Sequence, residues 1–410
     1  MEASRMTPSG AGPEWPAGEE RPVRVGVVGV GGRGFGHVRT LLDVPGVEIP
    51  AICDPSEDNV ARSQERVEQA GRCRPEGYSR GVEDYRRMLE RDDLDAVIAT
   101  GPWESHTPVC VAAMQAGKYA ATEVPAALTV DECWELVDTS EKTGKPCMLL
   151  ENVCYYRNVM LVMNLIRQGV LSELLHAAGG YEHDVRGAKI GPTGELKWRG
   201  MHSVARDANL YPTHPIGPIA WWLDINRGDR FTHLVSMSSN SRGINHYVAE
   251  RFGADHPNAK REYALGDVNT TLIKTARGLT VMLSHDTQSP RPYDLILRVQ
   301  GTAGIYSGTL DKIYIEGRSP QQGARRHTPV WEDLTDYYRQ YEHPVWTTLG
   351  QTAKQYPHGP ADYIELHQFV KAVRHQTQTP IDVYDAATWS VITALTEQSV
   401  AAKSAAVDFP

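Results

Sequence analysis

The sequence has few phenylalanines, no long apolar run and no excess of basic residues. It contains 5 Phe against 18 Tyr and 9 Trp, so most of its aromatic surface carries a hydroxyl or an indole N–H that suits a polar ligand. Lys and Arg number 42 against 51 Asp and Glu, and the net charge of −9 argues against nucleic acid, whose binding depends on cationic surface. No segment approaches the roughly 20 apolar residues of a membrane-spanning helix, and the first residues lack the basic and apolar regions of a secretion signal. We therefore expect a cytoplasmic protein that binds neither nucleic acid nor a membrane.

Cysteine is also scarce and is not paired in the sequence. None of the six cysteines forms a C-x-x-C motif, and most lie inside apolar runs: Cys53, Cys73, Cys110, Cys133, Cys147 and Cys154. Such cysteines are typical of buried free thiols in a reducing compartment. The sequence therefore predicts no disulfide framework and no metal site.

The 410 residues leave room for two or three domains. Residues 1–21 are rich in Pro, Gly, Glu and Ser, and we expect a disordered tail there. Residues 22–153 alternate short strands with helices, which predicts a doubly wound parallel sheet of the Rossmann type. The expected strands are 23–30, 47–53, 95–100, 119–124 and 147–152, and the expected helices follow Gly34 and cover 57–70, 106–116 and 130–143.

The pattern changes after residue 153. Successive β-type runs separated by turn residues, as at 276–279, predict hairpins of a large, mostly antiparallel sheet. The expected strands are 175–183, 232–240, 268–276, 279–287, 294–301 and 304–315, and helices are expected near 157–169, 361–375 and 385–403. Residues 154–410 are thus predicted to form an α+β substrate-binding domain whose last helices pack back on the rest of the protein.

A glycine-rich motif follows the first predicted strand. Gly29, Gly31 and Gly34, with Gly32 and Arg33 between them, form G-x-G-x-x-G directly before a helix. These glycines permit the tight turn and close approach of a dinucleotide diphosphate, and Asp54 after the second strand suits the ribose hydroxyls of NAD rather than the 2′-phosphate of NADP. Arg33 could instead hold a phosphate, and a plain glycine turn is the alternative to the cofactor site.

Polar residues also follow the later strands of the first domain. Ligands of open α/β sheets bind beyond the carboxyl ends of the strands, so these residues are candidates for a cofactor cleft. They are Trp103, Glu104, Ser105, His106, Glu123, Val124, Glu151 and Asn152. Loop chemistry, including a helix cap by His106, is the alternative for each of them.

The densest polar and aromatic cluster of the second domain is Asn209-Leu210-Tyr211-Pro212-Thr213-His214-Pro215. Prolines stiffen the backbone around His214, and histidine and tyrosine are suited to proton transfer. A structural loop in which His214 caps the next helix is the alternative. Tyr181, Arg199 and Tyr293 stand in similar motifs and are either ligand contacts or packing residues.

Over residues 22–403 the chain resembles the oxidoreductases that include glucose-fructose oxidoreductase and inositol dehydrogenase, the Gfo/Idh/MocA family. The resemblance rests on the glycine motif, a strand that ends in Glu-x-Pro, and the antiparallel-sheet domain. Dehydrogenases of that family usually have lysine in the Glu-x-Pro turn and aspartate four residues before the active-site histidine. This chain has Val124 and Leu210 at those positions.

Both departures match one branch of that family. Five segments are similar to the NAD-dependent α-N-acetylgalactosaminidases of glycoside hydrolase family 109: ENVCYYRN (151–158), GGYEHDVR (179–186), NLYPTH (209–214), HPNAKREYALGD (256–267) and SHDTQSPRPYDL (284–295). The resemblance implies that Gly32, Arg33, Asp54, Trp103 to His106, Glu123, Val124, Asn152 and Tyr211 to His214 line NAD. It also implies that Tyr181, Arg199, Tyr211 and Tyr293 hold the sugar.

The implied activity is hydrolysis of a glycoside by transient oxidation of sugar C3, deprotonation at C2, elimination of the aglycone, addition of water and re-reduction. We expect His214, Tyr211 and Tyr181 to share the proton transfers and Glu151 to orient them. A sugar or inositol dehydrogenase and a non-catalytic NAD-binding regulator are the alternatives. We also expect a homodimer or homotetramer, because an antiparallel sheet often leaves one face exposed.

Overall fold

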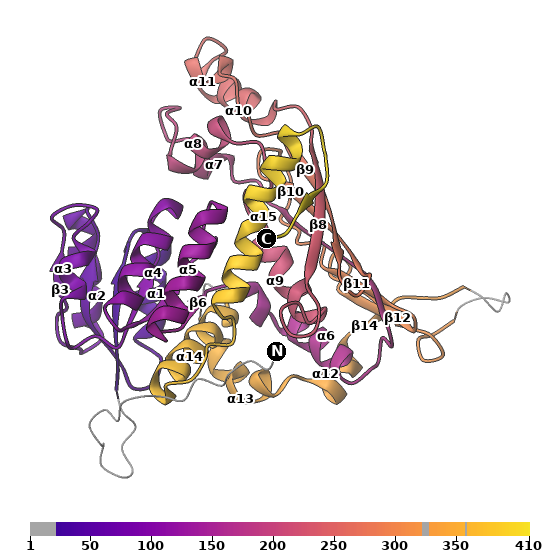
Figure 1. Ribbon diagram of the computed structural model, residues 1–410, viewed down its shortest axis with the longest axis horizontal. Coiled ribbons are helices and arrows are strands. Elements are labelled where there is room, and N and C mark those ends of the chain that lie inside the picture. The colour runs from indigo at the N-terminus through magenta and orange to yellow at the C-terminus, as the bar shows by residue number, and fades with distance from the viewer. Residues whose placement is uncertain (1–21, 322–327, 357–358) are drawn as a thin grey trace. The chain divides into compact units, whose positions relative to one another are not determined.

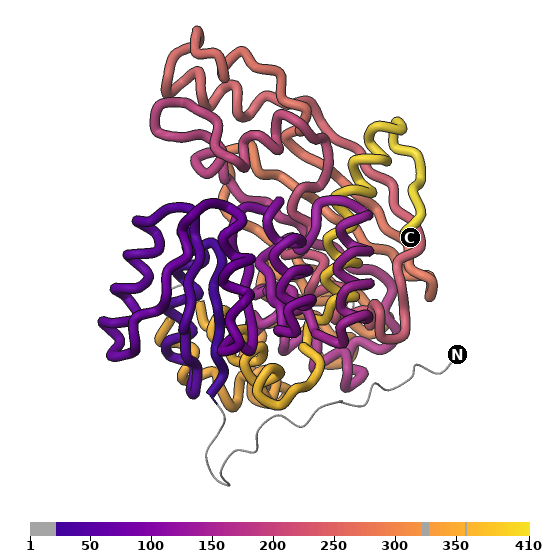
Figure 2. Tube along the Cα trace, turned by 60° about the vertical axis from the view of Figure 1, so that its left-hand side comes forward, coloured from indigo at the N-terminus to yellow at the C-terminus, as the bar shows by residue number. Residues whose placement is uncertain are grey.

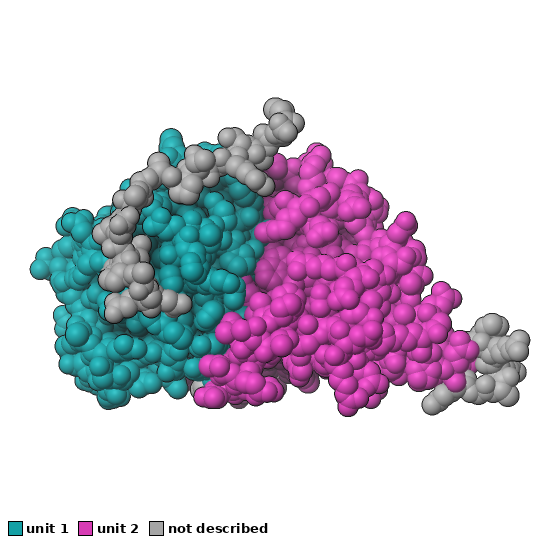
Figure 3. Space-filling model, turned by 90° about the horizontal axis from the view of Figure 1, so that it is seen from below, with its two compact units in different colours: residues 1–127, 131–150, 356–387 teal, residues 128–130, 151–355, 388–410 magenta. Residues whose placement is uncertain are grey.

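The computed structural model describes residues 22–321, 328–356 and 359–410, so the predicted tail at 1–21 lies outside the described residues. Its internal contacts divide the chain into two compact units, coloured separately in Figure 3. Unit 1 comprises residues up to 127, 131–150 and 356–387, and unit 2 comprises 128–130, 151–355 and 388–410.

Unit 1 contains a parallel sheet, and Figure 2 traces the N-terminal part of the chain that forms it in indigo and purple. Its six strands lie in the order β3-β2-β1-β4-β5-β6, and every neighbouring pair is parallel. They are β1 Val23–Val28, β2 Val47–Cys53, β3 Glu76–Tyr78, β4 Ala96–Ala99, β5 Tyr119–Thr122 and β6 Cys147–Leu149. The predicted doubly wound sheet is confirmed. Strand β3 was not predicted, because its three residues, Glu-Gly-Tyr, are too few for a hydrophobic pattern.

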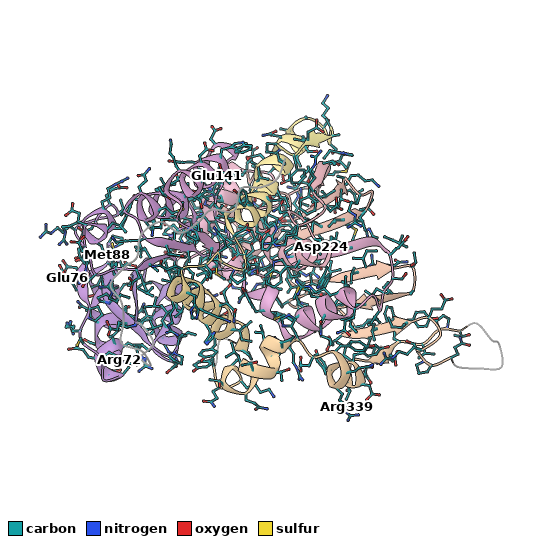
Figure 4. All side chains as sticks on the ribbon, turned by 60° about the horizontal axis from the view of Figure 1, so that its bottom comes forward. Arg72, Glu76, Met88, Glu141, Asp224 and Arg339 are labelled. Atoms are coloured by element: carbon teal, nitrogen blue, oxygen red, sulfur yellow. The ribbon has the colours of Figure 1, made fainter. Side chains whose placement is uncertain are left out.

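The helices of unit 1 follow from local signals. They are α1 Gly32–Leu41, α2 Glu57–Gln69, α3 Tyr85–Leu89, α4 His106–Gln115, α5 Val130–Thr143 and α14 Pro360–His375, with a 3-10 turn, η1, at Trp103–Ser105. In α2, the Ser56 hydroxyl accepts a hydrogen bond from the backbone N–H of Asn59 and caps the helix. Met88 of α3, labelled in Figure 4, is fully buried near Gly26 of β1. Helix α14 packs against α1, which brings a C-terminal segment of the chain to the glycine motif.

Unit 2 is built on a nine-stranded sheet with the order β14-β13-β12-β11-β7-β10-β9-β8-β15 (Figure 1). Its strands are β7 Leu174–Glu182, β8 Phe231–Ser238, β9 Val268–Thr275, β10 Thr280–Asp286, β11 Arg298–Gly301, β12 Gly304–Ser307, β13 Lys312–Ile315, β14 Glu332–Asp333 and β15 Val407–Asp408. Neighbouring strands are antiparallel except β7 and β10, which are parallel. The mostly antiparallel sheet and the hairpin at 276–279 are therefore confirmed.

Two strand predictions in unit 2 were wrong in detail. The run 304–315 is a hairpin of two strands, because the chain turns at Asp311, whose φ is 49° and whose N–H donates to the Gly308 carbonyl. The strand predicted at 294–301 begins only at Arg298. Ile296 and Leu297 before it have positive φ values of 61° and 22°, which an extended strand does not allow.

The helices of unit 2 include elements that the sequence did not predict, such as α7, α8, α10 and α11. The full set is η2 Asn152–Tyr155, α6 Arg157–Arg167, α7 Arg186–Lys189, α8 Trp198–Ala205, α9 Thr213–Trp222, α10 Gly243–Phe252, α11 Pro257–Lys260, α12 Thr335–Tyr341, α13 Pro344–Ala353 and most of α15 Val383–Ala401. Helix α9 packs closely on β7, since a Cβ at Gly179 would lie 2.8 Å from Cβ of Pro215.

All six cysteines lie in described residues and none forms a disulfide; five are buried and Cys73 is exposed. Within the described ranges, no helix combines the length and the apolar character needed to cross a bilayer. The same residues contain no group of three or more His, Cys, Asp or Glu side chains placed to hold a metal ion.

Candidate functional site

The glycine motif forms a tight turn between β1 and α1 in unit 1. Gly29 has a φ of +87°, and a Cβ there would lie 2.4 Å from the backbone nitrogen of Gly101. A Cβ at Gly34 would lie 2.0 Å from the carbonyl oxygen of Gly29. Side chains are therefore excluded at both positions, as the fingerprint requires.

The exposed side of the same turn fits a diphosphate. Apart from the adjoining residues and the backbone of α1 itself, no described heavy atom lies within 4 Å of a Cβ built on Gly31 or Gly32, so a ligand can approach this backbone closely. Among the described residues, no side chain caps α1 and its first turn carries no acidic residue. The first N–H groups of a helix attract anions, so this turn provides the cradle that a dinucleotide needs.

Asp54 lies directly after β2, where its carboxylate is held in place. Its Oδ1 accepts hydrogen bonds from the backbone N–H of Ser56 at 2.9 Å and from Nδ2 of Asn59 at 3.1 Å. Oδ2 has no such bond in the described chain, which leaves an acceptor oxygen for ribose hydroxyls.

The guanidinium of Arg33 forms ion pairs with two carboxylates of unit 1. Its Nε donates to Oε1 of Glu123 at 2.5 Å and its guanidinium pairs with Asp362 of α14, also at 2.5 Å. His37 Nε2 lies 2.6 Å from the same Glu123 oxygen. Burial alone would raise the pKa of Glu123, but Arg33 and His37 hold it well below its ordinary range. Sequence reasoning missed His37 and Asp362, because no motif links residues so far apart in the chain.

His106 contacts the backbone of two loops, the one that follows β4 and the one that follows β5. His106 is buried, with Nδ1 2.7 Å from the Pro125 carbonyl oxygen and Nε2 3.0 Å from that of Gly101. Its ring therefore contacts backbone on both sides. Trp103 and Val124 are buried, and Glu104 is exposed.

Helix α9 in unit 2 brings His214 onto Glu151. The Nδ1 atom of His214 lies 2.7 Å and 2.9 Å from the two carboxylate oxygens of Glu151, and Glu151 is completely buried. The Glu151 Oε1 also accepts from the backbone N–H of Val153. A carboxylate held in this way orients the imidazole and makes Nδ1 the donor, which leaves Nε2 as the basic atom.

Gly217, one helical turn after His214, makes room for this pair. A Cβ at Gly217 would lie 2.9 Å from each of Cγ of Glu151, Sγ of Cys154 and Cζ3 of Trp389. The absence of a side chain on α9 therefore lets the helix approach the buried carboxylate. The sequence contained Gly217 but offered no signal of this role.

Tyrosine and histidine rings gather around His214. Tyr181 on β7 has its ring 4.5 Å from that of Tyr211 and 5.3 Å from that of His214. The Tyr181 hydroxyl lies 3.0 Å from Nδ1 of His183, and the His183 ring lies 4.9 Å from that of Tyr293. The structure thus brings the three predicted tyrosines together and adds His183, which lies inside the GGYEHDVR segment but was not predicted as a site residue.

Burial and the nearby charge of Arg199 act in opposite directions on the pKa of Tyr181. The Arg199 guanidinium lies 5.6 Å from the Tyr211 ring centroid. Burial raises the pKa of Tyr181 to about 12, although the charge of Arg199 acts to lower it. Tyr181 therefore keeps its proton at neutral pH.

Asn152, beside Glu151, begins η2 and is half-buried.

The predicted residues consequently form two sets. Gly29 to Val124 lie in unit 1, and Glu151 and Asn152 lie in unit 2 together with Tyr181, Arg199, Tyr211 to His214 and Tyr293. In unit 2, ring contacts and hydrogen bonds link Glu151, Tyr181, Tyr211, His214 and Tyr293 into one cluster.

Solved structures of low sequence identity share the fold. A levoglucosan dehydrogenase in complex with NADH and levoglucosan matches with a TM-score of 0.71 at 21% identity, over 95% of this chain and 100% of that one. The myo-inositol dehydrogenase of Lactobacillus casei matches with a TM-score of 0.64 at 17% identity, over 95% and 97% of the two chains.

Comparison of sequences identifies the family. Residues 23–150 match the oxidoreductase family's NAD-binding Rossmann fold, and residues 155–410 match the C-terminal domain of glycosyl hydrolase 109. An α-N-acetylgalactosaminidase of Tannerella forsythia is 41% identical over 96% of this chain and 87% of its own length. A glycosyl hydrolase family 109 protein of Parabacteroides distasonis is 40% identical over the same shares. The chain therefore belongs to glycoside hydrolase family 109 and is a glycoside hydrolase that uses NAD.

Proposed function

We propose that this enzyme hydrolyses α-N-acetylgalactosaminides by temporary oxidation at sugar C3 and elimination across C1 and C2. The hydrogen bonds between buried Glu151 and His214 are the observation that carries the proposal, since they give the chain one oriented base beside three tyrosines. The name of the Tannerella forsythia relative supports the choice of sugar. NAD, when bound, supplies the hydride acceptor at C3 and the hydride donor that restores the alcohol.

We assign the base to His214. Its Nε2 takes the proton from the C3 hydroxyl or from C2 once the adjacent C3 is a ketone, because a carbonyl acidifies the neighbouring C–H. The Glu151 carboxylate stabilises the imidazolium that forms, as a buried acceptor of the Nδ1–H. Glu151 is therefore a positioning residue.

The tyrosines serve as proton donors and binding groups in this proposal. Tyr181, with its raised pKa, is suited to donate a hydrogen bond to the sugar or the departing oxygen rather than to act as a base. Tyr211 shares these transfers from its place beside His214. Arg199 and Tyr293 bind the sugar hydroxyls.

In unit 1, we assign the diphosphate of NAD to the backbone N–H groups at Gly31 and Gly32 and the adenine ribose to Asp54. The chemistry of both groups fits, as the open turn and the available Oδ2 of Asp54 indicate. We assign the main cofactor-binding role to residues 22–153 and substrate binding to residues 154–410. We keep as further NAD contacts the other predicted residues, Trp103 to His106, Glu123, Val124, Asn152 and Tyr211 to His214. Because Arg33 pairs with Glu123 and Asp362, we expect it to shape the glycine turn as well.

We also propose that the enzyme is a homo-oligomer that associates through the outer face of its nine-stranded sheet. Met237 and Leu272 are 64% and 52% exposed there, and Leu272 pairs across the strands with Val235 and Met282. A continuous apolar stripe of this kind favours association.

Light scattering tests this interface. It should show a smaller particle for Leu272→Lys but not for Val82→Lys, an exposed apolar position in unit 1. An unchanged mass for Leu272→Lys would contradict this interface.

A panel of nitrophenyl glycosides, assayed with and without added NAD, tests the function. We expect release of nitrophenol from the α-N-acetylgalactosaminide without net growth of the NADH absorbance. A sugar dehydrogenase would instead accumulate NADH with free sugar and release no nitrophenol. A regulatory NAD-binding protein would do neither.

A further inference from the structure

Unit 2 contains a groove that the proposed reaction does not use. It has a volume of about 860 Å³ and lies between the end of α8 at Val204, one side of α10, and the segment from α11 to Ala264. Figure 1 shows α7, α8, α10 and α11 together in the upper part of unit 2. The volume is within the range of about 300–1,000 Å³ that is usual for ligand sites.

Arginine side chains supply the unpaired positive charge of this groove. Arg242, Lys260 and Arg261 line it together with one carboxylate, Glu262. Lys260 is paired with Asp255 at 2.7 Å, so the charge that remains is that of the two arginines. This sign is opposite to the net charge of the chain, which is −9. A local excess of positive charge on an acidic protein concentrates anionic ligands at that place.

Two of the cations are available to a ligand. In the described part of the chain, no carboxylate lies within ion-pair distance of the guanidinium of Arg242 or Arg261. Arg261 Nε donates to Oδ1 of Asn258 at 2.8 Å, and one terminal nitrogen of Arg242 donates to the Ser241 carbonyl. Each guanidinium has five N–H donors, so donors remain on both for carboxylate or sulfate oxygens.

The walls of the groove are held in place by their own core and hydrogen bonds. Ile190, Ile244, Val248 and Tyr263 form a buried apolar cluster behind it. Asn245 Nδ2 donates to the backbone carbonyls of Ala259 and Arg261, which ties α10 to the opposite wall. A preformed site of this kind loses little entropy when a ligand binds.

The groove is linked to the sugar-binding residues by α8. Arg199 lies near the start of that helix and Val204 near its end, about 7.5 Å apart along the axis at 1.5 Å per residue. The apolar side chains of the lining are mainly small, as in Ala249, Ala254 and Ala259. Together with the exposed arginines they suit a hydrophilic and anionic chain.

We infer that this groove binds the acidic saccharide part of a glycoside substrate through Arg242 and Arg261. The identification of the ligand as a saccharide rests on the proposed function, whereas the preference for anions rests on the groove itself. Carboxylate and sulfate groups share the required chemistry, and the test below separates them.

Titration calorimetry of the full chain with a galacturonic acid hexamer tests the inference at physiological ionic strength. We expect binding of this hexamer and no measurable binding of a neutral galactose hexamer. The double variant Arg242→Gln/Arg261→Gln should bind the acidic hexamer at least about tenfold more weakly, because both charge-assisted contacts are lost. The control Arg72→Gln/Arg339→Gln removes two exposed charges that are labelled in Figure 4 and should bind as the unaltered protein does.

Further probes give the outcomes that overturn the inference. A chondroitin sulfate hexamer that binds in an Arg242- and Arg261-dependent way supports it and shows that sulfate is accepted. Equal binding of hexaglutamate would assign the groove to an acidic peptide instead. Displacement by equimolar inorganic sulfate would indicate an adventitious ion only, and equal weakening by the control variant would indicate a general charge effect. Because these assays measure binding without turnover, failure of the nitrophenyl glycoside assay would overturn the proposed function separately.

Discussion

At the scale of single residues, the pair formed by Glu151 and His214 is the central feature. A completely buried carboxylate contacts one imidazole nitrogen through two short distances, 2.7 Å and 2.9 Å. A buried charge of this kind is costly unless it is paired and hydrogen-bonded, so the pairing explains why Glu151 is tolerated in the core.

Replacement of His214 by alanine should lower kcat on a nitrophenyl α-N-acetylgalactosaminide by about 10²–10⁴-fold, the usual contribution of a general base. NAD binding, measured by titration calorimetry, should persist. His233→Ala, at an exposed position on β8, is the matched control and should keep normal turnover. Near-normal hydrolysis by His214→Ala would refute the assignment.

A second prediction concerns His285 on β10. Its ring is buried, its Nδ1 has no hydrogen-bond partner in the described chain, and burial together with the charge of Lys189 lowers its pKa to about 3. In the unfolded chain the pKa is about 6.5, so between these values the unfolded state binds a proton that the folded state does not. Stability is therefore lost as the pH falls from about 6.5 towards 3, by up to a few kcal/mol.

Urea unfolding at several pH values between 4.5 and 7.5 checks this prediction. The variant His285→Gln removes the titrating group and should lose less stability on acidification than the unaltered protein does. Identical losses for the two proteins would contradict the role of His285.

At the scale of elements, the approach of α9 to β7 and to Glu151 determines the site. Glycines on both elements permit it, since side chains at Gly179 and Gly217 would overlap Pro215 and Glu151 respectively. Helix propensity alone would favour alanine at Gly217 by about 1 kcal/mol. The helix propensity of this position therefore favours alanine, whereas the close contact with Glu151 requires glycine.

Gly217→Ala should lower kcat more than it raises KM, because the new methyl group displaces the Glu151 carboxylate from His214 while Arg199 and Tyr293 remain. Steady-state kinetics measure the two effects separately. Gly187→Ala in α7 is the control, because the nearest atom to its Cβ would lie at an ordinary 3.5 Å. Equal kinetics for the two alanine variants would show that the close packing of Gly217 does not position Glu151.

At the scale of the whole molecule, the chain combines a NAD-binding Rossmann domain with the C-terminal domain of a glycosyl hydrolase family. Hydrolysis of a glycoside changes no oxidation state overall. A redox cofactor is useful to it only if hydride is removed and returned within each turnover, and this requirement has a measurable consequence at C2.

Hydrolysis of a substrate deuterated at C2 should release sugar that has exchanged its deuterium for solvent hydrogen, because elimination requires removal of the C2 proton. Mass spectrometry of the released sugar measures the exchange, and unlabelled substrate in D₂O provides the reciprocal control. Complete retention of deuterium would exclude elimination and with it the role given to His214.

Local patterns were sufficient for much of the fold. The glycine turn, the strands β1 and β2 and the hairpin at 276–279 follow from short-range signals that act within a few residues. Short elements such as β3, α7 and α11 were missed, because three or four residues carry no measurable periodicity and are stabilised by tertiary contacts.

The amino-acid sequence by itself determined the fold class, the glycine turn and the family, because turn geometry and apolar periodicity depend on neighbouring residues and the long motifs are contiguous. Only the tertiary structure decided which side chains pair. Glu151 meets His214 across 63 positions, and Arg33 meets Asp362 across 329. Such contacts depend on how closely whole elements pack, as at Gly217. The groove lined by Arg242 and Arg261 has the same origin, because separate segments of the chain bring these two cations to one surface.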